Sequence, residues 1–163
     1  MNDMNTPNRA DPAIYPKMRR HALEIRLPNL ATDAVHAVLM DWHVGNGTAS
    51  VLAAADGTAS IYLSSGGGFI GGGQRYPAIR EAAHHAVLLA TGLLSQLEIT
   101  EKTDLPPSGD VYFYVTTSRG MRLAIAKEVN LRDGTDPLAA LGATMQKIVT
   151  DYRLTSMEHP AKS

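Results

Sequence analysis

The chain has no cysteine among its 163 residues, which excludes disulfides, thiolate nucleophiles and cysteine-ligated zinc. Charge of neither sign is in excess, because 15 Lys and Arg residues face 16 Asp and Glu residues. That balance argues against a dedicated nucleic-acid surface and against a polybasic membrane patch. No apolar run approaches the roughly 20 residues of a membrane helix, and the polar start lacks the apolar stretch of a secretory signal. We therefore expect a soluble, cytoplasmic protein.

A chain of this length corresponds to about one domain at roughly 150 residues per domain. Area scaling lets it bury about 69% of its extended-chain surface, which is enough for a self-sufficient core. Asn, Asp and Pro are frequent at the start of the chain, as in segments that do not fold. We expect a disordered lead-in at 1–12, a single α+β domain at 13–155 and a flexible tail at 156–163.

The segment 36–64 predicts a three-stranded meander. Asp56 and Gly57 lie between two alternating runs, and this pair is typical of a two-residue hairpin turn with positive φ at both positions. Such a turn pairs Ala54 with Ala59. It therefore sets the register between the second and third strands.

The upstream turn lies at 45–47, where the chain reads Gly-Asn-Gly, and closes either with all three residues or with the last two. The three-residue turn gathers the larger apolar side chains on one face, so burial favours it. The expected core face consists of Val38, Met40, Trp42, Val44, Leu52, Ala54, Ala59, Ile61 and Leu63. The opposite face is small and almost uncharged, and consists of Ala37, Leu39, Asp41, His43, Ala49, Val51, Ala53, Ser60 and Tyr62. Because solvated sheet faces normally carry charged residues, we expect this opposite face to be covered.

Two amphipathic helices and a second hairpin follow the meander. Apolar residues at helical spacing predict a long helix at 76–97 and a last helix at 137–152, for which Asp136 is the N-cap. Residues 110–128 predict a hairpin closed by a three-residue turn. The segment 16–27 fits either a short helix or a strand, and we favour the helix.

These elements predict an α+β fold with one five-stranded antiparallel sheet in the order β-β-β-α-β-β-α. Hairpins force antiparallel pairing, and the first strand is central because both of its faces carry apolar residues, which gives the spatial order 3-2-1-5-4. Two helices cover one face, and the short N-terminal helix, if it forms, is a third helix of the fold. The layout resembles profilin-like and roadblock-like proteins. No motif of either family is present, so no function is carried over.

A glycine-rich loop at 64–75 is the sharpest local signal. Gly66, Gly68 and Gly71 match the GxGxxG spacing of dinucleotide sites. However, the preceding strand belongs to a meander, and Thr91 stands where a ribose-binding acid is expected. Three interpretations remain: a structural loop with its apolar residues in the core, a partner-binding segment, or an anion or ligand site. The candidate ligand-binding residues are Gly66, Gly67, Gly68, Phe69, Ile70, Gly71, Gly72, Gly73 and Arg75.

Other ionisable residues form no complete catalytic set. Glu81 and His84 have the ExxH spacing of di-iron bundles, which require two copies. Asp41 and His43 share a strand face and predict a buried hydrogen-bonded pair rather than an acid–base or metal pair. A basic cluster indicates a solvated helix face rather than a nucleic-acid contact; it consists of Lys17, Arg19, Arg20 and Arg26. We identify no catalytic residue, metal site or cofactor site, and expect no nucleic-acid or membrane partner.

Tyrosines with small residues on the opposite sheet face are typical of an interface. We expect either a second copy of the chain or the N-terminal helix to cover them, and the second copy would give a two-fold dimer. The candidate interface residues are Leu39, Val51, Tyr62, Tyr112, Tyr114 and Ala124. The sequence favours a non-enzymatic, self-associating interaction module. The alternative is a small-ligand or phosphoanion-binding protein, conceivably an enzyme, that uses the glycine-rich loop.

Overall fold

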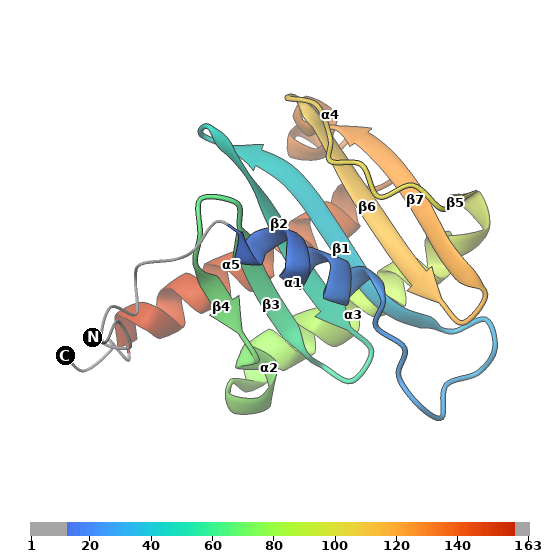
Figure 1. The fold of residues 1–163 in the computed structure, drawn as a ribbon, viewed down its shortest axis with the longest axis horizontal. Helices are drawn as coiled ribbons and strands as arrows, with labels where there is room; N and C mark the ends of the chain where they lie inside the picture. The colour runs from blue at the N-terminus through green and yellow to red at the C-terminus, as the bar shows by residue number, and fades with distance from the viewer. Residues whose placement is uncertain (1–12, 159–163) are drawn as a thin grey trace.

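The computed structural model describes residues 13–158 (Figure 1). The expected lead-in at 1–12 lies outside the described residues, and so does the end of the expected tail. The helices are α1 (Ile14–Leu23), α2 (Gly72–Arg75), α3 (Pro77–Leu93), α4 (Glu128–Asp133) and α5 (Ala139–Glu158), with a 3-10 turn at Leu94–Gln96. The strands are β1 (Val35–Val44), β2 (Gly47–Ala54), β3 (Ala59–Leu63), β4 (Gly68–Ile70), β5 (Glu98–Thr100), β6 (Asp110–Thr117) and β7 (Gly120–Lys127).

All of these strands join one antiparallel sheet in the order β4-β3-β2-β1-β6-β7-β5. The predicted α+β class and single antiparallel sheet are confirmed, but the predicted number of five strands is wrong, because the sheet has seven. The two additional strands, β4 and β5, have three residues each and form the two edges. Strands this short carry no readable alternation, and β4 lies inside the glycine-rich segment.

The predicted strand order is also wrong beside β1. We expected the second strand of the 110–128 hairpin to lie next to β1, whereas β6 pairs with β1 and β7 lies outside β6. β6 is buried along most of its length, while β7 exposes Ile125 and Lys127. The hairpin arm with two buried faces therefore takes the inner position.

The turn between β2 and β3 uses three residues, 55–57, instead of the predicted two. Ala54 N–H donates to Thr58 O at 2.8 Å, so Ala54 lies opposite Thr58 and not opposite Ala59 as expected. Only Gly57 needs a positive φ, of 91°, and Asp56 Oδ1 accepts the N–H of Thr58 at 2.9 Å. The Asp-Gly pair predicted the position of the turn correctly. The hydrogen bond between the Asp56 side chain and the Thr58 N–H stabilises the three-residue loop instead of the two-residue one.

The turn between β1 and β2 is shorter than predicted, with two residues instead of three. Val44 pairs with Gly47, so the loop has two residues and begins with Gly45 at φ 60°. Both differences move β2 by one position, which exchanges its two faces. Val51 therefore packs on the α3 and α5 side, whereas Leu52 lies on the opposite face.

The second hairpin also closes more tightly than predicted. Thr117 pairs with Gly120, which leaves a two-residue turn at 118–119. Ala124 then lies opposite Phe113 and belongs to the core below α3 and α5. The prediction that placed it on the tyrosine face is wrong by one position.

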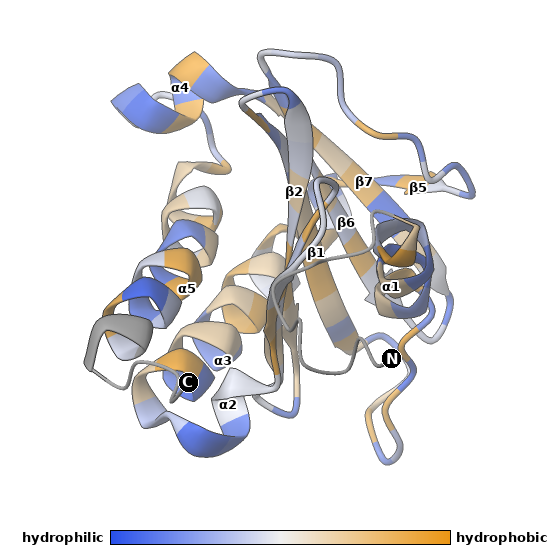
Figure 2. Cartoon of the chain, turned by 60° about the vertical axis from the view of Figure 1, so that its left-hand side comes forward, coloured by the Kyte–Doolittle hydropathy of each residue, from blue (hydrophilic) through white to orange (hydrophobic). Residues whose placement is uncertain are grey.

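Three layers result from this arrangement. Figure 2 shows α3 and α5 on one side of the sheet and α1 on the other. The larger core lies between the sheet and α3 and α5, and a second cluster lies under α1. The expected N-terminal helix thus forms at 14–23 and covers part of the second face. Within residues 13–158, no helix has the length and apolar character that crossing a bilayer requires.

Candidate interaction surfaces

The tyrosine face of the sheet is covered within the chain. Ala22 and Leu23 of α1 belong to the same buried cluster as Leu39, Tyr62 and Tyr114. The buried side chains of α1 are Tyr15, Arg19, Ala22 and Leu23, and their i, i+4, i+7 and i+8 spacing places them on the side of the helix that faces the sheet. α1 therefore occupies the position that a second chain would take in the predicted interface.

The six candidate interface residues do not form one surface. Four lie on the α1 side, where Leu39, Tyr62 and Tyr114 are buried and Tyr112 is half-buried. The other two are buried on the opposite side of the sheet; they are Val51 and Ala124.

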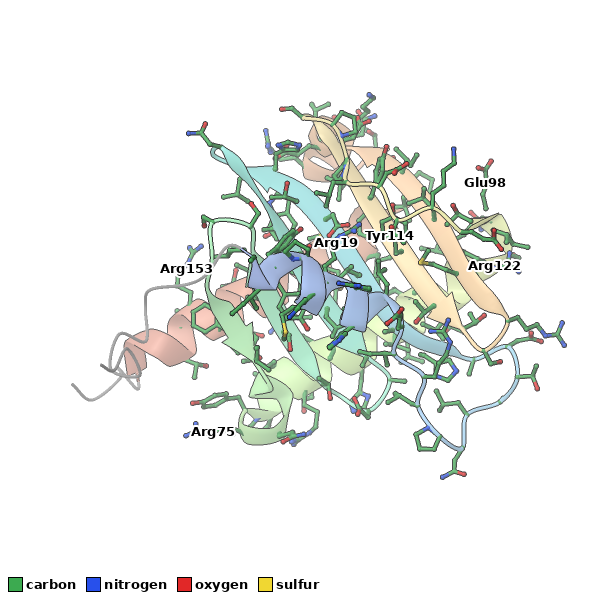
Figure 3. The ribbon with its side chains drawn as sticks, in the orientation of Figure 1. Arg19, Arg75, Glu98, Tyr114, Arg122 and Arg153 are labelled. Atoms are coloured by element: carbon green, nitrogen blue, oxygen red, sulfur yellow. The ribbon has the colours of Figure 1, made fainter. Side chains whose placement is uncertain are left out.

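Arg19 fastens α1 to the sheet and to the loop that follows β5. Its Nε and Nη2 donate to Asp41 Oδ2 at 3.1 and 2.7 Å. Its Nη1 donates to Thr103 O at 2.7 Å and its Nη2 to Asp104 O at 3.2 Å. Figure 3 shows Arg19 beside Tyr114, whose ring centroid lies 5.4 Å below the guanidinium carbon. The predicted solvated basic face is therefore wrong for Arg19, which is 8% exposed.

The carboxylate of Asp41 is fully buried and is held from both sides. Its second oxygen accepts a hydrogen bond from Ser50 Oγ, which lies 2.7 Å from Tyr15 Oη. Burial raises the pKa of the Asp41 carboxyl, and the hydrogen bonds from Arg19 and Ser50 act against that rise. Burial also raises the pKa of Tyr15 and of Tyr114 to about 12. Protein atoms satisfy the hydrogen bonds of this network, which therefore connects α1 to β1 and β2.

The other ionisable candidates lie apart. Asp41 bonds Arg19 and Ser50, while His43 Nε2 lies 2.8 Å from Pro106 O. The predicted Asp41–His43 pair is therefore replaced by two separate contacts. Glu81 and His84 are exposed on α3, and among residues 13–158 no three His, Asp or Glu side chains gather as a metal site requires.

The glycine-rich segment is explained by close packing of its backbone. A Cβ on Gly68 would overlap the carbonyl of Ile61 on β3, and one on Gly73 would overlap the carbonyl of Gly57. Gly71 has a φ of 75°, which side chains rarely adopt. Each of these glycines has a structural reason that involves no ligand.

Tyr152 of α5 ties this segment to the sheet. Its hydroxyl accepts the N–H of Gly72 at 2.5 Å and donates to Ala59 O at 2.6 Å. Its ring stacks on Phe69 with centroids 5.0 Å apart. The sequence predicted a last helix at 137–152, but nothing in its apolar spacing indicated that the Tyr152 hydroxyl has two backbone partners.

The apolar side chains of β4 remain at the surface. Phe69 is 40% exposed and Ile70 is 68% exposed, so the interpretation that placed both side chains in the core is wrong on this point. A hollow of about 190 Å³ lies beside them, between β4 and the end of α5. It is lined by Phe69, Ile70, Gly71, Gly72, Arg75, Tyr76, Tyr152 and Thr155.

The two sheet edges differ in charge. The β4 edge belongs to a stretch, 57–74, that contains no Asp, Glu, Lys or Arg. The β5 edge carries Glu98 and is followed by Glu101 and Lys102. Charged residues on an edge strand discourage pairing with another chain, and only the β4 edge lacks them. No protein-family model, no curated protein and no solved structure matches this chain.

Proposed function

We propose that this protein is a non-enzymatic interaction module that self-associates by pairing β4 with β4 of a second copy. The observation that carries the proposal is the exposed, uncharged and apolar edge strand formed by Gly68, Phe69 and Ile70. Along an antiparallel edge, every other residue turns its N–H and C=O away from the sheet, where an added strand can bond them. A second strand there would continue the sheet across both copies.

A copy of the same strand suits this edge because a two-fold axis brings identical residues together. Like charges would repel across such an axis, but 57–74 carries none. The hollow beside β4 is lined by the rings of Phe69, Tyr76 and Tyr152 and by Arg75, so a side chain of the added strand would contact aromatic surface and one cation. Stable dimers bury about 800 Å² per partner, and a three-residue strand supplies less. We therefore expect a dimer that dissociates on dilution.

The experiment compares two exposed aliphatic residues that are changed to lysine. Ile70→Lys places a charge on the β4 edge, and Leu88→Lys places one on the outer side of α3; the parent side chains are 68% and 69% exposed. We expect the wild-type protein and Leu88→Lys to be dimeric in the high micromolar range by sedimentation velocity. Ile70→Lys should be monomeric with an unchanged circular dichroism spectrum.

Two results would contradict the proposal. One is a wild-type protein that remains monomeric at the highest soluble concentration. The other is a dimer that persists in Ile70→Lys, which would place the contact elsewhere on the molecule.

A further inference from the structure

A separate pocket of about 410 Å³ lies on the α3 and α5 side of the sheet, beneath α4. Its floor is formed by Met40 and Trp42 of β1 and Val111 of β6. Leu131 of α4 and Gly142 of α5 form its walls. Figure 2 shows α4 standing off the end of the sheet, beyond the start of α5. This volume falls within the range of small-molecule sites.

The mouth of the pocket is polar and its charges cancel. Glu128 Oε1 accepts a hydrogen bond from Arg132 Nη2 at 3.1 Å, and both side chains line the opening. Gln146 adds an amide that offers a donor and an acceptor. An apolar interior with a few polar groups at the rim is the usual composition of a site for a small ligand.

Gly142 supplies an independent observation. It is buried within the 20-residue helix α5, where glycine weakens a helix relative to alanine. Its backbone does not have a positive φ, and a Cβ there would meet Leu131 and Phe113 at ordinary contact distances of 3.5–3.6 Å. Neither conformation nor crowding requires glycine here. The absent side chain leaves space beside Trp42 and Leu131 that a larger residue would fill.

We propose that this pocket binds a small molecule with an aromatic or branched aliphatic body and an uncharged or zwitterionic polar group. The body lies against Met40, Trp42 and Leu131, which are apolar or nearly so. The polar group lies at the mouth, where Gln146 and the Glu128–Arg132 ion pair offer donors and acceptors without net charge. The pocket is on the helix side of β1 and is independent of the β4 edge.

The test uses N-phenyl-1-naphthylamine, an uncharged aromatic probe that is fluorescent in apolar surroundings. Trp42 is the only tryptophan of the chain, so energy transfer from tryptophan to the probe reports binding near Trp42. We expect saturable transfer with the full-length wild-type protein. Gly142→Leu fills the pocket and should raise the dissociation constant of the probe by about tenfold or more.

The matched control is Gly92→Leu, at an exposed position of α3 with no atom within 4 Å of the added Cβ. It should bind the probe like the wild-type protein. If Gly142→Leu does not fold, Ala143→Phe decides, because Ala143 is exposed and lines the same pocket. Energy transfer that does not saturate, or equal probe affinity in the folded pocket variant, would overturn the proposal.

Discussion

Three glycines of this chain differ in what opposes a side chain at their position, and substitution to alanine measures each effect. A Cβ on Gly73 overlaps a backbone carbonyl that cannot move without disturbing the β2–β3 turn. A Cβ on Gly71 has free space, so only the positive φ of 75° opposes it. Gly92 has neither restriction. Steric overlap with backbone is the most severe of these effects.

We expect the free energy of unfolding to follow that order. Gly73→Ala should lose about 3 kcal/mol or more, and Gly71→Ala about 1–2 kcal/mol. Gly92→Ala should gain about 0.5–1 kcal/mol, because alanine favours the interior of a helix. Urea denaturation of the three variants provides the measurement. Equal losses at Gly71 and Gly73 would contradict the close approach of Gly73 to the β2–β3 turn.

Elements could be located from the sequence more reliably than their registers. The helices at 76–97 and 137–152 were predictable because their apolar stripes have helical spacing and each has a proline near its start. The register of β2 was not, because we chose the turn at 45–47 that gathers the larger apolar side chains on one face. Both faces of the sheet are buried, since α1 covers the second one. Val51 and Leu52 would therefore both be buried in either register, and burial could not distinguish the two. The turns therefore determined the register. Asp56 accepts a hydrogen bond that closes a three-residue loop, whereas an Asp-Gly sequence is typical of a two-residue loop.

One buried ion pair, Arg19–Asp41, contributes to the attachment of α1, and a double-mutant cycle measures that contribution. Arg19→Ala leaves the carboxylate of Asp41 buried without its charged partner, and should cost about 3–5 kcal/mol of unfolding free energy. Adding Asp41→Ala removes that unpaired charge, so the double variant should lose less than the sum of the single variants. Urea unfolding measures each corner of the cycle.

The control for this cycle is the ion pair between Lys147 and Asp151 on α5, in which the Lys147 side chain is 57% exposed and the Asp151 side chain 13% exposed. Lys147→Ala should change stability by only about 0.5 kcal/mol. Additive losses for Arg19 and Asp41 would show that the two side chains do not interact in the folded protein. In that case the apolar residues of α1 and the Tyr15–Ser50 hydrogen bond would hold the helix to the sheet.

At the scale of the whole molecule, self-association could use the β4 edge or the sheet face that carries the candidate interface residues. The two surfaces predict opposite effects of a charged substitution on the sheet face. The sequence showed that the sheet face opposite the core is almost uncharged and predicted that this face is covered. It did not reveal the edge strand β4, because a three-residue strand that exposes Ile70 gives no periodic signal. The tyrosine face drew attention instead, although α1 from the same chain fills that position.

Val51→Glu distinguishes these surfaces. Val51 is fully buried against the helix layer, so the variant places a carboxylate in the core without a partner. That cost is several kcal/mol, comparable with the roughly 5–15 kcal/mol that hold an ordinary domain together. Thermal unfolding followed by circular dichroism should show a transition that is lost or greatly lowered. Ile125→Glu, on an exposed position of β7, should retain the wild-type transition. A folded, monomeric Val51→Glu would instead place Val51 between two chains, and the sheet face would replace the β4 edge as the site of self-association.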